Sequence, residues 1–188
     1  PTAIFFISKG SVVFAFFLSI FFLASSYEWI KMNKKDILKF IGIFYLFFTS
    51  VLAYLLREKF SLEIFILILI ICVFTDLGGY IFGKFFKGKK ITKISPNKTY
   101  AGMIGSFFLS LLVSSIFFSD LNLIINIFLF TIIISTISQL GDLFVSLLKR
   151  KAKIKDTGNF LPGHGGLLDR IDGILFTIPI GIILISLQ

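Results

Sequence analysis

Long apolar stretches, separated by short lysine-rich segments, constrain this chain more than any other feature. Several of them run for about 18 residues or more without a charged side chain, roughly the length that an α-helix needs to cross the hydrocarbon core of a bilayer. Hydrophobic residue types make up 56% of the 188 residues. A soluble domain of this size needs more polar surface than such a composition provides. The sequence therefore predicts an integral membrane protein.

The apolar pattern predicts an all-α fold, a polytopic transmembrane helical bundle of about six membrane-spanning helices in a single domain over residues 1–188. Lys9 interrupts an apolar stretch that is already under way at Pro1, so we expect further sequence ahead of residue 1. The expected membrane segments are Gly10–Tyr27, Ile37–Leu56, Ile64–Gly83, Ala101–Phe118, a longer helix from about Leu121 through Leu148, and the short segment Gly173–Leu187.

Lysine and arginine are distributed unevenly between the connections. Those after the first, third and fifth segments hold four, six and six of them, whereas the opposite side holds only Arg57 and Lys59. Cytoplasmic connections carry the excess of positive charge in membrane proteins. We therefore expect the lysine-rich connections to face the cytoplasm, in the inner or plasma membrane if the protein is bacterial. Orientation and contacts with lipid or nucleotide phosphates then explain the net charge of +9, and no nucleic-acid partner is expected.

Two aspartates interrupt the expected helices. Asp76 and Asp142 each lie about 10 Å before the lysine-rich end of a segment, at helical rise. An ionised carboxylate at such depth costs at least a few kcal/mol unless it is paired or bound to a metal. A salt bridge within the bundle and a functional site both remain open at this point. Polar residues recur around Asp142 at spacings of three and four, which predicts a stripe along a water-accessible cavity; they are Ser135, Ser138, Gln139, Ser146 and Lys149.

Residues 142–172 hold the densest polar signal, with four aspartates, six basic residues, the only histidine of the chain and several glycines. Carboxylates that converge suit hard cations such as Mg²⁺, which takes oxygen ligands and usually keeps waters and substrate phosphates. Basic residues beside them suit a polyphosphate, and glycines let backbone amides approach an anion. The segment therefore predicts a metal–nucleotide site. For His164, a hydrogen-bonding loop residue, a phosphate contact and an acid–base group stay open.

An earlier connection has a related character. Lys98 lies in a Ser-Pro-x-Lys-Thr turn just before the fourth segment, which makes it a better site candidate than the lysines around residue 89. Gly102 and Gly105, at the start of that segment, are typical of close packing between membrane helices and need no catalytic explanation.

Together these residues resemble the phosphatidate cytidylyltransferase (CDP-diacylglycerol synthase) family. Close similarity covers about residues 75–172, and it implies N-terminal transmembrane helices over residues 10–72 and a catalytic cytidylyltransferase region over 73–188. The implied reaction joins CTP to phosphatidic acid in phospholipid biosynthesis, giving CDP-diacylglycerol and pyrophosphate. The signature is matched at Ser146, Lys149-Arg150, Lys155-Asp156, Pro162, His164-Gly165-Gly166 and Asp169-Arg170-x-Asp172, and a second motif at Asp76–Gly83 and Ser95–Thr99.

The resemblance also implies roles for individual residues. Asp142 and Asp169 would hold Mg²⁺, with a second cation left open, and Asp172 would complete or orient that cluster. Phosphates of CTP would meet Lys149, Arg150 and Lys155, and the lipid phosphate would meet Lys98 and Arg170. His164 would shape the nucleotide loop with Gly163, Gly165 and Gly166, and the expected substrate-binding set further includes Asp76, Ser95 and Asp156. A homodimer is left open.

Two other functions would also place charged groups in or beside membrane helices. A CTP-dependent polyprenol or dolichol kinase would use similar groups but would transfer the γ-phosphate to a lipid alcohol. A membrane transporter would also place acids in membrane helices, yet it would need charged residues along a path through the bilayer. Here the acids cluster toward one face, and the opposite half is almost purely apolar, which disfavours a transporter.

Overall fold

The computed structural model describes residues 2–92, 95, 98–118, 121, 126–158 and 165–186. These residues form helices and no β-strand, which confirms the predicted all-α fold. The elements are α1 (Thr2–Lys9), α2 (Ser11–Met32), α3 (Asp36–Leu55) continued by the π-helical turn η1 (Leu56–Phe60), α4 (Leu62–Phe86), α5 (Tyr100–Phe117), α6 (Ile127–Lys151) and α7 (Leu168–Ser186).

Five helices of the described part are long and apolar enough to cross a membrane: α2, α3 with η1, α4, α5 and α6. Their outward faces are rich in aromatic side chains, and Phe40, Phe44 and Phe85 are each more than 70% exposed. Such a surface suits lipid and not water. The sixth expected segment corresponds to α7, which has 19 residues and carries Asp169, Arg170 and Asp172 in its first two turns.

Several helix boundaries differ from the expectation; α2, for example, ends at Met32 and not at Tyr27. α6 begins at Ile127 and not near Leu121, because the side chain of Asn126 caps it by accepting a 2.9 Å hydrogen bond from the Phe128 N–H. At the other end of the chain, α1 is a separate short helix that the apolar pattern did not predict. The chain turns between α1 and α2 at Gly10, whose φ of 62° is one that glycine adopts without strain.

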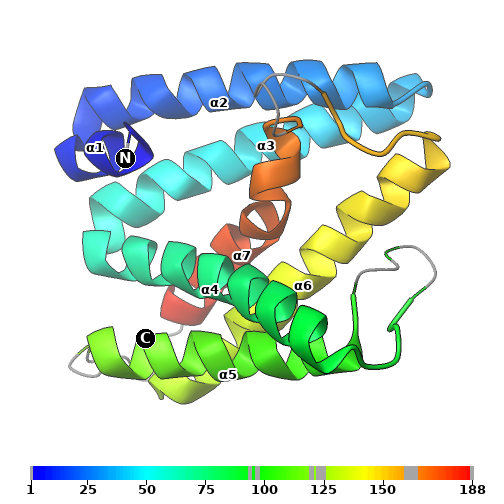
Figure 1. The fold of residues 1–188 in the computed structure, drawn as a ribbon. Helices are drawn as coiled ribbons and strands as arrows, with labels where there is room; N and C mark the ends of the chain where they lie inside the picture. The colour runs from blue at the N-terminus through cyan, green and yellow to red at the C-terminus, as the bar shows by residue number, and fades with distance from the viewer. Residues whose placement is uncertain are drawn as a thin grey trace.

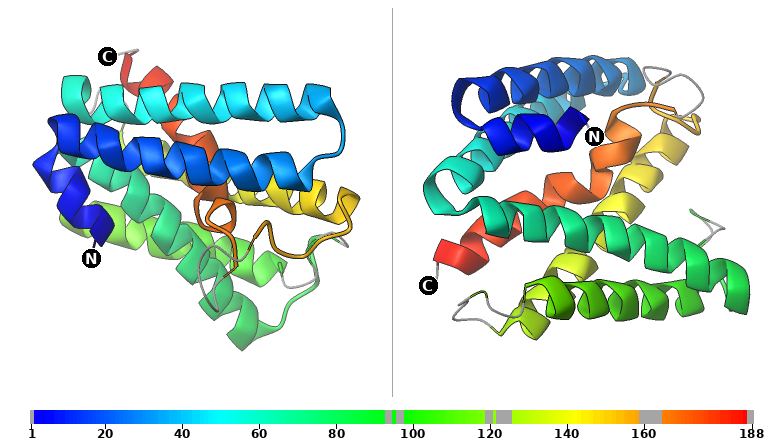
Figure 2. Two further views of the ribbon diagram at one scale, coloured as in Figure 1. Left: turned by 90° about the horizontal axis from the view of Figure 1, so that it is seen from above. Right: turned by 60° about the vertical axis from the view of Figure 1, so that its left-hand side comes forward.

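The helices form two antiparallel pairs with α6 and α7 between them. Figure 1 shows α2 beside α3 on one side of the molecule and α4 beside α5 on the other. α6 and α7 cross obliquely between these pairs and pack against each other, as the views in Figure 2 also show. The charged first turns of α7 and the middle of α6 are thereby enclosed by the other helices.

Glycines allow α4 and α5 to pack closely. A Cβ atom added to Gly78 would lie 2.8 Å from the carbonyl carbon of Gly105 and 2.9 Å from the Cα of Ser106, so no larger residue fits there. The expectation that the glycines at the start of α5 serve helix packing is thus confirmed. This contact fixes the end of α4 that carries Asp76 beside the start of α5, which Lys98 precedes.

A proline lies within α7 and is accommodated by a neighbouring helix. Pro179 has no N–H to donate to the carbonyl of Leu175, four residues earlier. The hydroxyl of Tyr45 on α3 donates to that carbonyl instead, at 3.0 Å. The α3–α7 contact therefore rests on a hydrogen bond as well as on apolar packing.

Candidate active site

A polar cavity of about 280 Å³ lies between α4, α5 and α6 and the connection before α5. Asp76 and Asp142 both line it, with Ser95 and Lys98 from the connection. The Lys98 Nζ lies 2.5 Å from the Asp142 Oδ2 and also donates to the Gln139 carbonyl at 3.4 Å. The structure thus brings together residues from both lysine-rich regions that the sequence singled out.

Hydroxyl groups fix the three helices around this cavity. The Thr75 Oγ1 on α4 donates to the Ser135 Oγ on α6 at 2.8 Å, and the Ser106 Oγ on α5 donates to the Thr75 carbonyl at 2.6 Å. Ser135 and Ser138 are buried, with 0% and 1% of their surface exposed, so the prediction that they line a water-accessible cavity was wrong. Only Gln139 and Asp142 of the predicted stripe line it. The serines instead pack within the bundle.

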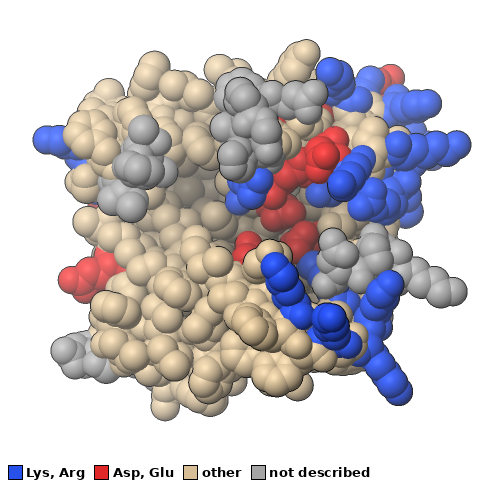
Figure 3. Space-filling view, in the orientation of Figure 1, with Lys and Arg blue, Asp and Glu red and all other residues tan. Residues whose placement is uncertain are grey.

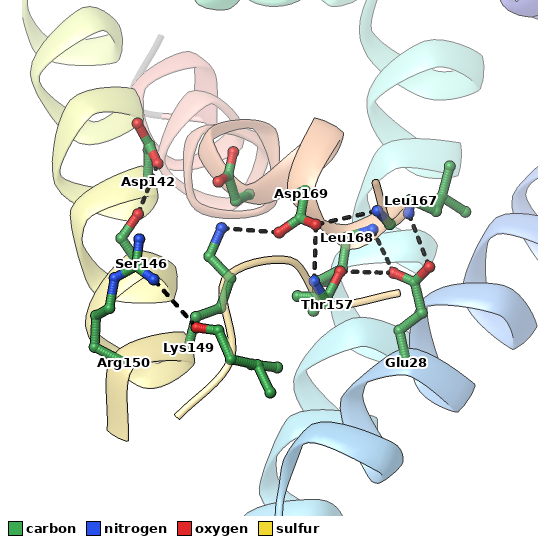
Figure 4. A network of polar contacts seen from close by, with 12 residues as sticks. Glu28, Asp142, Ser146, Lys149, Arg150, Thr157, Leu167, Leu168 and Asp169 are labelled. Atoms are coloured by element: carbon green, nitrogen blue, oxygen red, sulfur yellow. Dashed lines mark hydrogen bonds and ion pairs between the residues drawn. The ribbon is translucent and has the colours of Figure 1, made fainter. Parts of the chain in front are cut away.

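A second charged pair joins α6 to α7. The Lys149 Nζ donates to the Asp169 Oδ1 at 2.8 Å, and each side chain is only 11% exposed. The Asp169 Oδ2 accepts from the backbone N–H groups of Thr157 and Gly166, at 2.8 and 3.1 Å. Figure 4 shows Lys149 and Asp169 pointing toward each other from the two helices.

Asp169 lies ahead of the apolar segment of α7 that begins at Gly173. Burial would raise the pKa of its carboxyl, but the hydrogen bonds from Lys149, Thr157 and Gly166, together with the lysine charge, hold that pKa below its ordinary value. Asp169 is therefore a carboxylate whose two oxygens both have protein donors. A carboxylate served in this way is a fixed negative charge at the start of α7.

Asp172 is the acidic group of α7 that lies near Asp142. Its Oδ1 accepts from its own neighbour, the Gly173 N–H, at 2.8 Å, and its carboxyl lies close enough to that of Asp142 to interact with it. Ser146, one turn beyond Asp142, donates to the Asp142 Oδ1 at 3.3 Å. Asp142 is thus the point at which the cavity, α6 and α7 meet. Figure 3 shows acidic side chains gathered at the centre of one face, with Lys and Arg concentrated at one end of the molecule.

Glu28 on α2 is a polar anchor that the sequence analysis did not identify. It is 3% exposed, and its Oε2 accepts from the Leu168 N–H at 2.8 Å and from the Thr157 Oγ1 at 3.0 Å. Its Oε1 accepts from the Leu167 N–H at 2.9 Å. The one signal in the sequence was an acid directly after the expected segment Gly10–Tyr27, where an interfacial side chain is the ordinary interpretation.

Thr157 connects Glu28 to the Lys149–Asp169 pair, because its N–H donates a hydrogen bond to Asp169 and its hydroxyl donates one to Glu28. Glycines make room for the carboxylate of Glu28: a Cβ on Gly158 would lie 2.7 Å from the Glu28 Oε1, and one on Gly166 would lie 2.7 Å from the Oε2. Gly165 has a φ of 83°, which disfavours any side chain there. Two carboxylates, Glu28 and Asp169, thus hold both ends of the loop between Thr157 and Gly166, called the glycine-containing loop below.

The remaining predicted residues lie at the surface or outside the described residues. Lys155 and Asp156 are exposed, and so is Arg150, whose Nη1 donates to the Ile154 carbonyl at 3.3 Å. Arg170 is exposed and lines a second, apolar cavity. Gly163 and His164 lie outside the described residues, so the alternatives for His164 stay open.

The donor chemistry of the site fits Mg²⁺, which prefers carboxylate oxygens and keeps several ligand positions for water and phosphate. Asp142 and Asp169 supply such oxygens, and each is neutralised by a lysine ammonium group at 2.5 and 2.8 Å. No group of three or more His, Cys, Asp or Glu within the described ranges is arranged to hold a metal ion. The assignment of Asp142 and Asp169 to one cation stays a prediction.

The fold and the site define a helical membrane protein with a partly buried set of carboxylates and lysines, suited to phosphate groups, at one end of its bundle. The family model described as the cytidylyltransferase family matches residues 1–188. The chain belongs to the cytidylyltransferase family.

Several relatives carry the same name. The phosphatidate cytidylyltransferase of Staphylococcus aureus (strain COL) is 42% identical over 145 residues, which cover 75% of this chain and 54% of that protein. The Staphylococcus haemolyticus enzyme of that name is 50% identical over 110 residues, or 56% of this chain and 42% of the relative. The Staphylococcus epidermidis enzyme is 35% identical over 179 residues, or 92% and 66%. The chain thus spans from under half to about two thirds of the length of these relatives.

Proposed function

We propose that this chain catalyses the transfer of the cytidylyl group of CTP to phosphatidic acid, forming CDP-diacylglycerol and releasing pyrophosphate. The observation that supports it most strongly is the pairing of Lys98 with Asp142 and of Lys149 with Asp169 across three segments of the chain. Carboxylates alone would suit cation transport and lysines alone a lipid surface, whereas both together suit a metal-complexed polyphosphate. Relatives named phosphatidate cytidylyltransferase support the same reaction.

The reaction forms one phosphorus–oxygen bond and breaks another. An oxygen of the lipid phosphate attacks the α-phosphorus of CTP, and the bond to the β-phosphate breaks with its electrons going to pyrophosphate. A phosphate monoester has a second pKa of about 6, so the attacking oxygen is already anionic near neutral pH and no general base is required. The task of the protein is therefore positioning and charge neutralisation.

The lysines perform that task in our proposal. When substrate binds, Lys98 and Lys149 leave their carboxylate partners and form ion pairs with the phosphate groups of the substrates. Mg²⁺, held by Asp142 and Asp169, would supply charge neutralisation at the phosphates. Asp172 orients Asp142 from α7, and Asp76 completes the acidic wall of the cavity from α4. Arg150, Lys155 and Arg170 are placed at the exposed rim to receive further phosphate charge.

We place the lysine-rich end of the bundle, with the site near it, at the cytoplasmic face of the membrane. The gathering of Lys and Arg at one end of the molecule supports this orientation through the positive-inside rule. CTP is a cytosolic nucleotide and would reach the polar cavity directly from that side. A homodimer stays a prediction, which the mass of the purified protein in detergent would test.

The decisive experiment incubates purified protein with CTP labelled at the α-phosphate, phosphatidic acid and Mg²⁺, and then separates the lipid products. Labelled CDP-lipid, formed together with pyrophosphate, is the expected result. Release of CDP with phosphorylation of a lipid alcohol would instead establish a lipid kinase and overturn the proposal. The variants Asp142→Asn and Asp169→Asn should each lose turnover by about 100-fold or more, since each removes charge stabilisation of the transition state.

A further inference from the structure

A second cavity shares no lining residue with the polar cavity. It has a volume of about 440 Å³ and is bounded by α2, α3, α4 and α7. Its walls are almost wholly apolar, with Phe14 and Phe17 from α2 and Phe65 from α4 among them. Four polar side chains lie in this lining: Ser25 on α2, Thr49 and Ser50 on α3, and Arg170 on α7. Arg170 directly follows Asp169 of the polar site.

The unpaired hydroxyl of Ser25 is the feature that indicates a ligand in this cavity. Its side chain is 1% exposed, and its hydroxyl has no hydrogen-bond partner among the residues that the structure describes. Buried hydroxyls in proteins are nearly always hydrogen-bonded, because leaving one unpaired destabilises the fold. Serines in membrane helices can use a carbonyl of their own helix, as Ser19 does with Ala15 at 2.9 Å, but Ser25 does not. Its hydroxyl is therefore an unsatisfied donor in the wall of the cavity.

The order of chemical groups along the cavity matches a phospholipid. Ser25 lies seven residues before the end of α2, about 10 Å at helical rise, and Phe14 lies about 16 Å further from that end. A cation, a hydroxyl donor and a long apolar wall thus line the cavity. A phosphatidic acid molecule carries a phosphate, an ester carbonyl and an acyl chain in that order.

Building on the proposed function, we propose that this cavity binds one acyl chain of phosphatidic acid, with Arg170 facing the phosphate and the Ser25 hydroxyl donating to the ester carbonyl. Charge complementarity at Arg170 favours an anionic lipid. A transmembrane helix from another segment or from a second copy could also occupy an apolar cavity. Its backbone carbonyls, however, already accept hydrogen bonds within the helix and offer Ser25 no free acceptor. An ester carbonyl has no donor within the lipid, so it can accept a hydrogen bond from the Ser25 hydroxyl.

Photo-crosslinking tests the location of the acyl chain without relying on turnover. Phosphatidic acid with a diazirine in the outer half of one acyl chain is added to the purified full chain, irradiated and mapped by mass spectrometry. Adducts on the α2 face around Phe14 and Phe17, displaced by unlabelled phosphatidic acid, are expected. Adducts confined to outward-facing residues such as Phe40, or adducts in the cavity that phosphatidic acid fails to displace, would overturn the proposal.

Two variants test the hydroxyl and the apolar wall. Ser25→Ala should raise the KM for diester phosphatidic acid on the order of 2- to 10-fold, the effect of one hydrogen bond, and should not change the KM for a dialkyl-ether analogue that lacks the carbonyl. Val73→Phe, at a half-exposed position of the lining, should raise the KM for long-chain but not for short-chain phosphatidic acid. Val51→Phe is the matched control, since Val51 is exposed and lies outside the lining.

The outcomes separate this inference from the proposed function. Crosslinking within the cavity without CDP-lipid synthesis would retain the lipid site and reject the reaction. CDP-lipid synthesis with equal ester and ether responses in Ser25→Ala, and with Val73→Phe behaving like Val51→Phe, would retain the reaction and reject the lipid site.

Discussion

The carboxylate of Glu28 on α2 accepts a 2.8 Å hydrogen bond from the N–H of Leu168, the first residue of α7. The first N–H groups of a helix have no partner within the helix, and the positive end of the helix dipole favours an anion there. A residue from the first long helix therefore caps the helix that carries Asp169. The same carboxylate also accepts from Thr157, so it holds both segments that flank the glycine-containing loop.

Replacing Glu28 with Gln should destabilise this arrangement. A glutamine has one acceptor oxygen, and its NH₂ group would face an N–H or hydroxyl donor, so at least one buried donor loses its partner at a cost of about 1–3 kcal/mol. The thermal midpoint in detergent should fall, and the Leu167 and Leu168 amides should exchange hydrogen faster. Glu63→Gln is the control, because Glu63 is exposed in the first turn of α4. Unchanged exchange in Glu28→Gln would contradict the capping role.

The Lys149–Asp169 pair should show strong coupling in a double-mutant cycle. Both side chains are nearly buried, so Lys149→Met leaves an unpaired carboxylate, a loss of about 3–5 kcal/mol for a buried pair. The double variant Lys149→Met with Asp169→Asn should lose less than the sum of the two single variants. Unfolding midpoints of the four proteins in one detergent give the coupling. Additive losses would mean that the two groups do not interact in the membrane protein.

Stability should also depend on the titration of Asp169. Because its pKa is held below the ordinary value, its contribution is fully present above the unfolded pKa of about 3.9 and is lost as the pH falls through the folded pKa. Thermal midpoints measured from pH 7 downward should therefore drop below about pH 4. The Asp169→Asn variant should show a smaller drop over that range, and an identical profile in both proteins would argue against a depressed pKa.

Lys98 should matter for turnover far more than neighbouring lysines. Its Nζ contacts Asp142 inside the cavity, whereas Lys89 is exposed and outside the lining. Lys98→Met should reduce kcat by about 100-fold or more, the usual loss when one charge-stabilising donor is removed. Lys89→Met should change kcat by less than about 2-fold. Equal activities of the two variants would place the phosphate groups elsewhere.

Sequence patterns predicted the parts of this protein that depend on one segment at a time. Apolar length identified the membrane helices, and the depth of Asp76 and Asp142 within them singled out two residues that line the polar cavity. The fourth segment was also correctly expected to pack through its glycines, because small residues three or four positions apart are typical of close contacts between membrane helices. These inferences require no knowledge of which helix lies next to which.

Features that depend on neighbouring helices were not predicted. Ser135 and Ser138 share a helical face with Asp142, but α4 and α7 cover them and leave the cavity to Gln139 and Asp142. The partners of Glu28 could not be predicted, since they lie more than a hundred residues away in the sequence. Nor could the sequence assign Lys98 to Asp142 and Lys149 to Asp169, because lysines outnumber the acids in every connection.

The two lysine–carboxylate contacts have a consequence for how this protein reaches its working form. Because Lys98 pairs with Asp142 and Lys149 pairs with Asp169, the negative charge of these two carboxylates is balanced by residues of the chain itself. Insertion into the bilayer then needs no bound ion to offset these carboxylates. Chelators should accordingly leave the substrate-free protein folded.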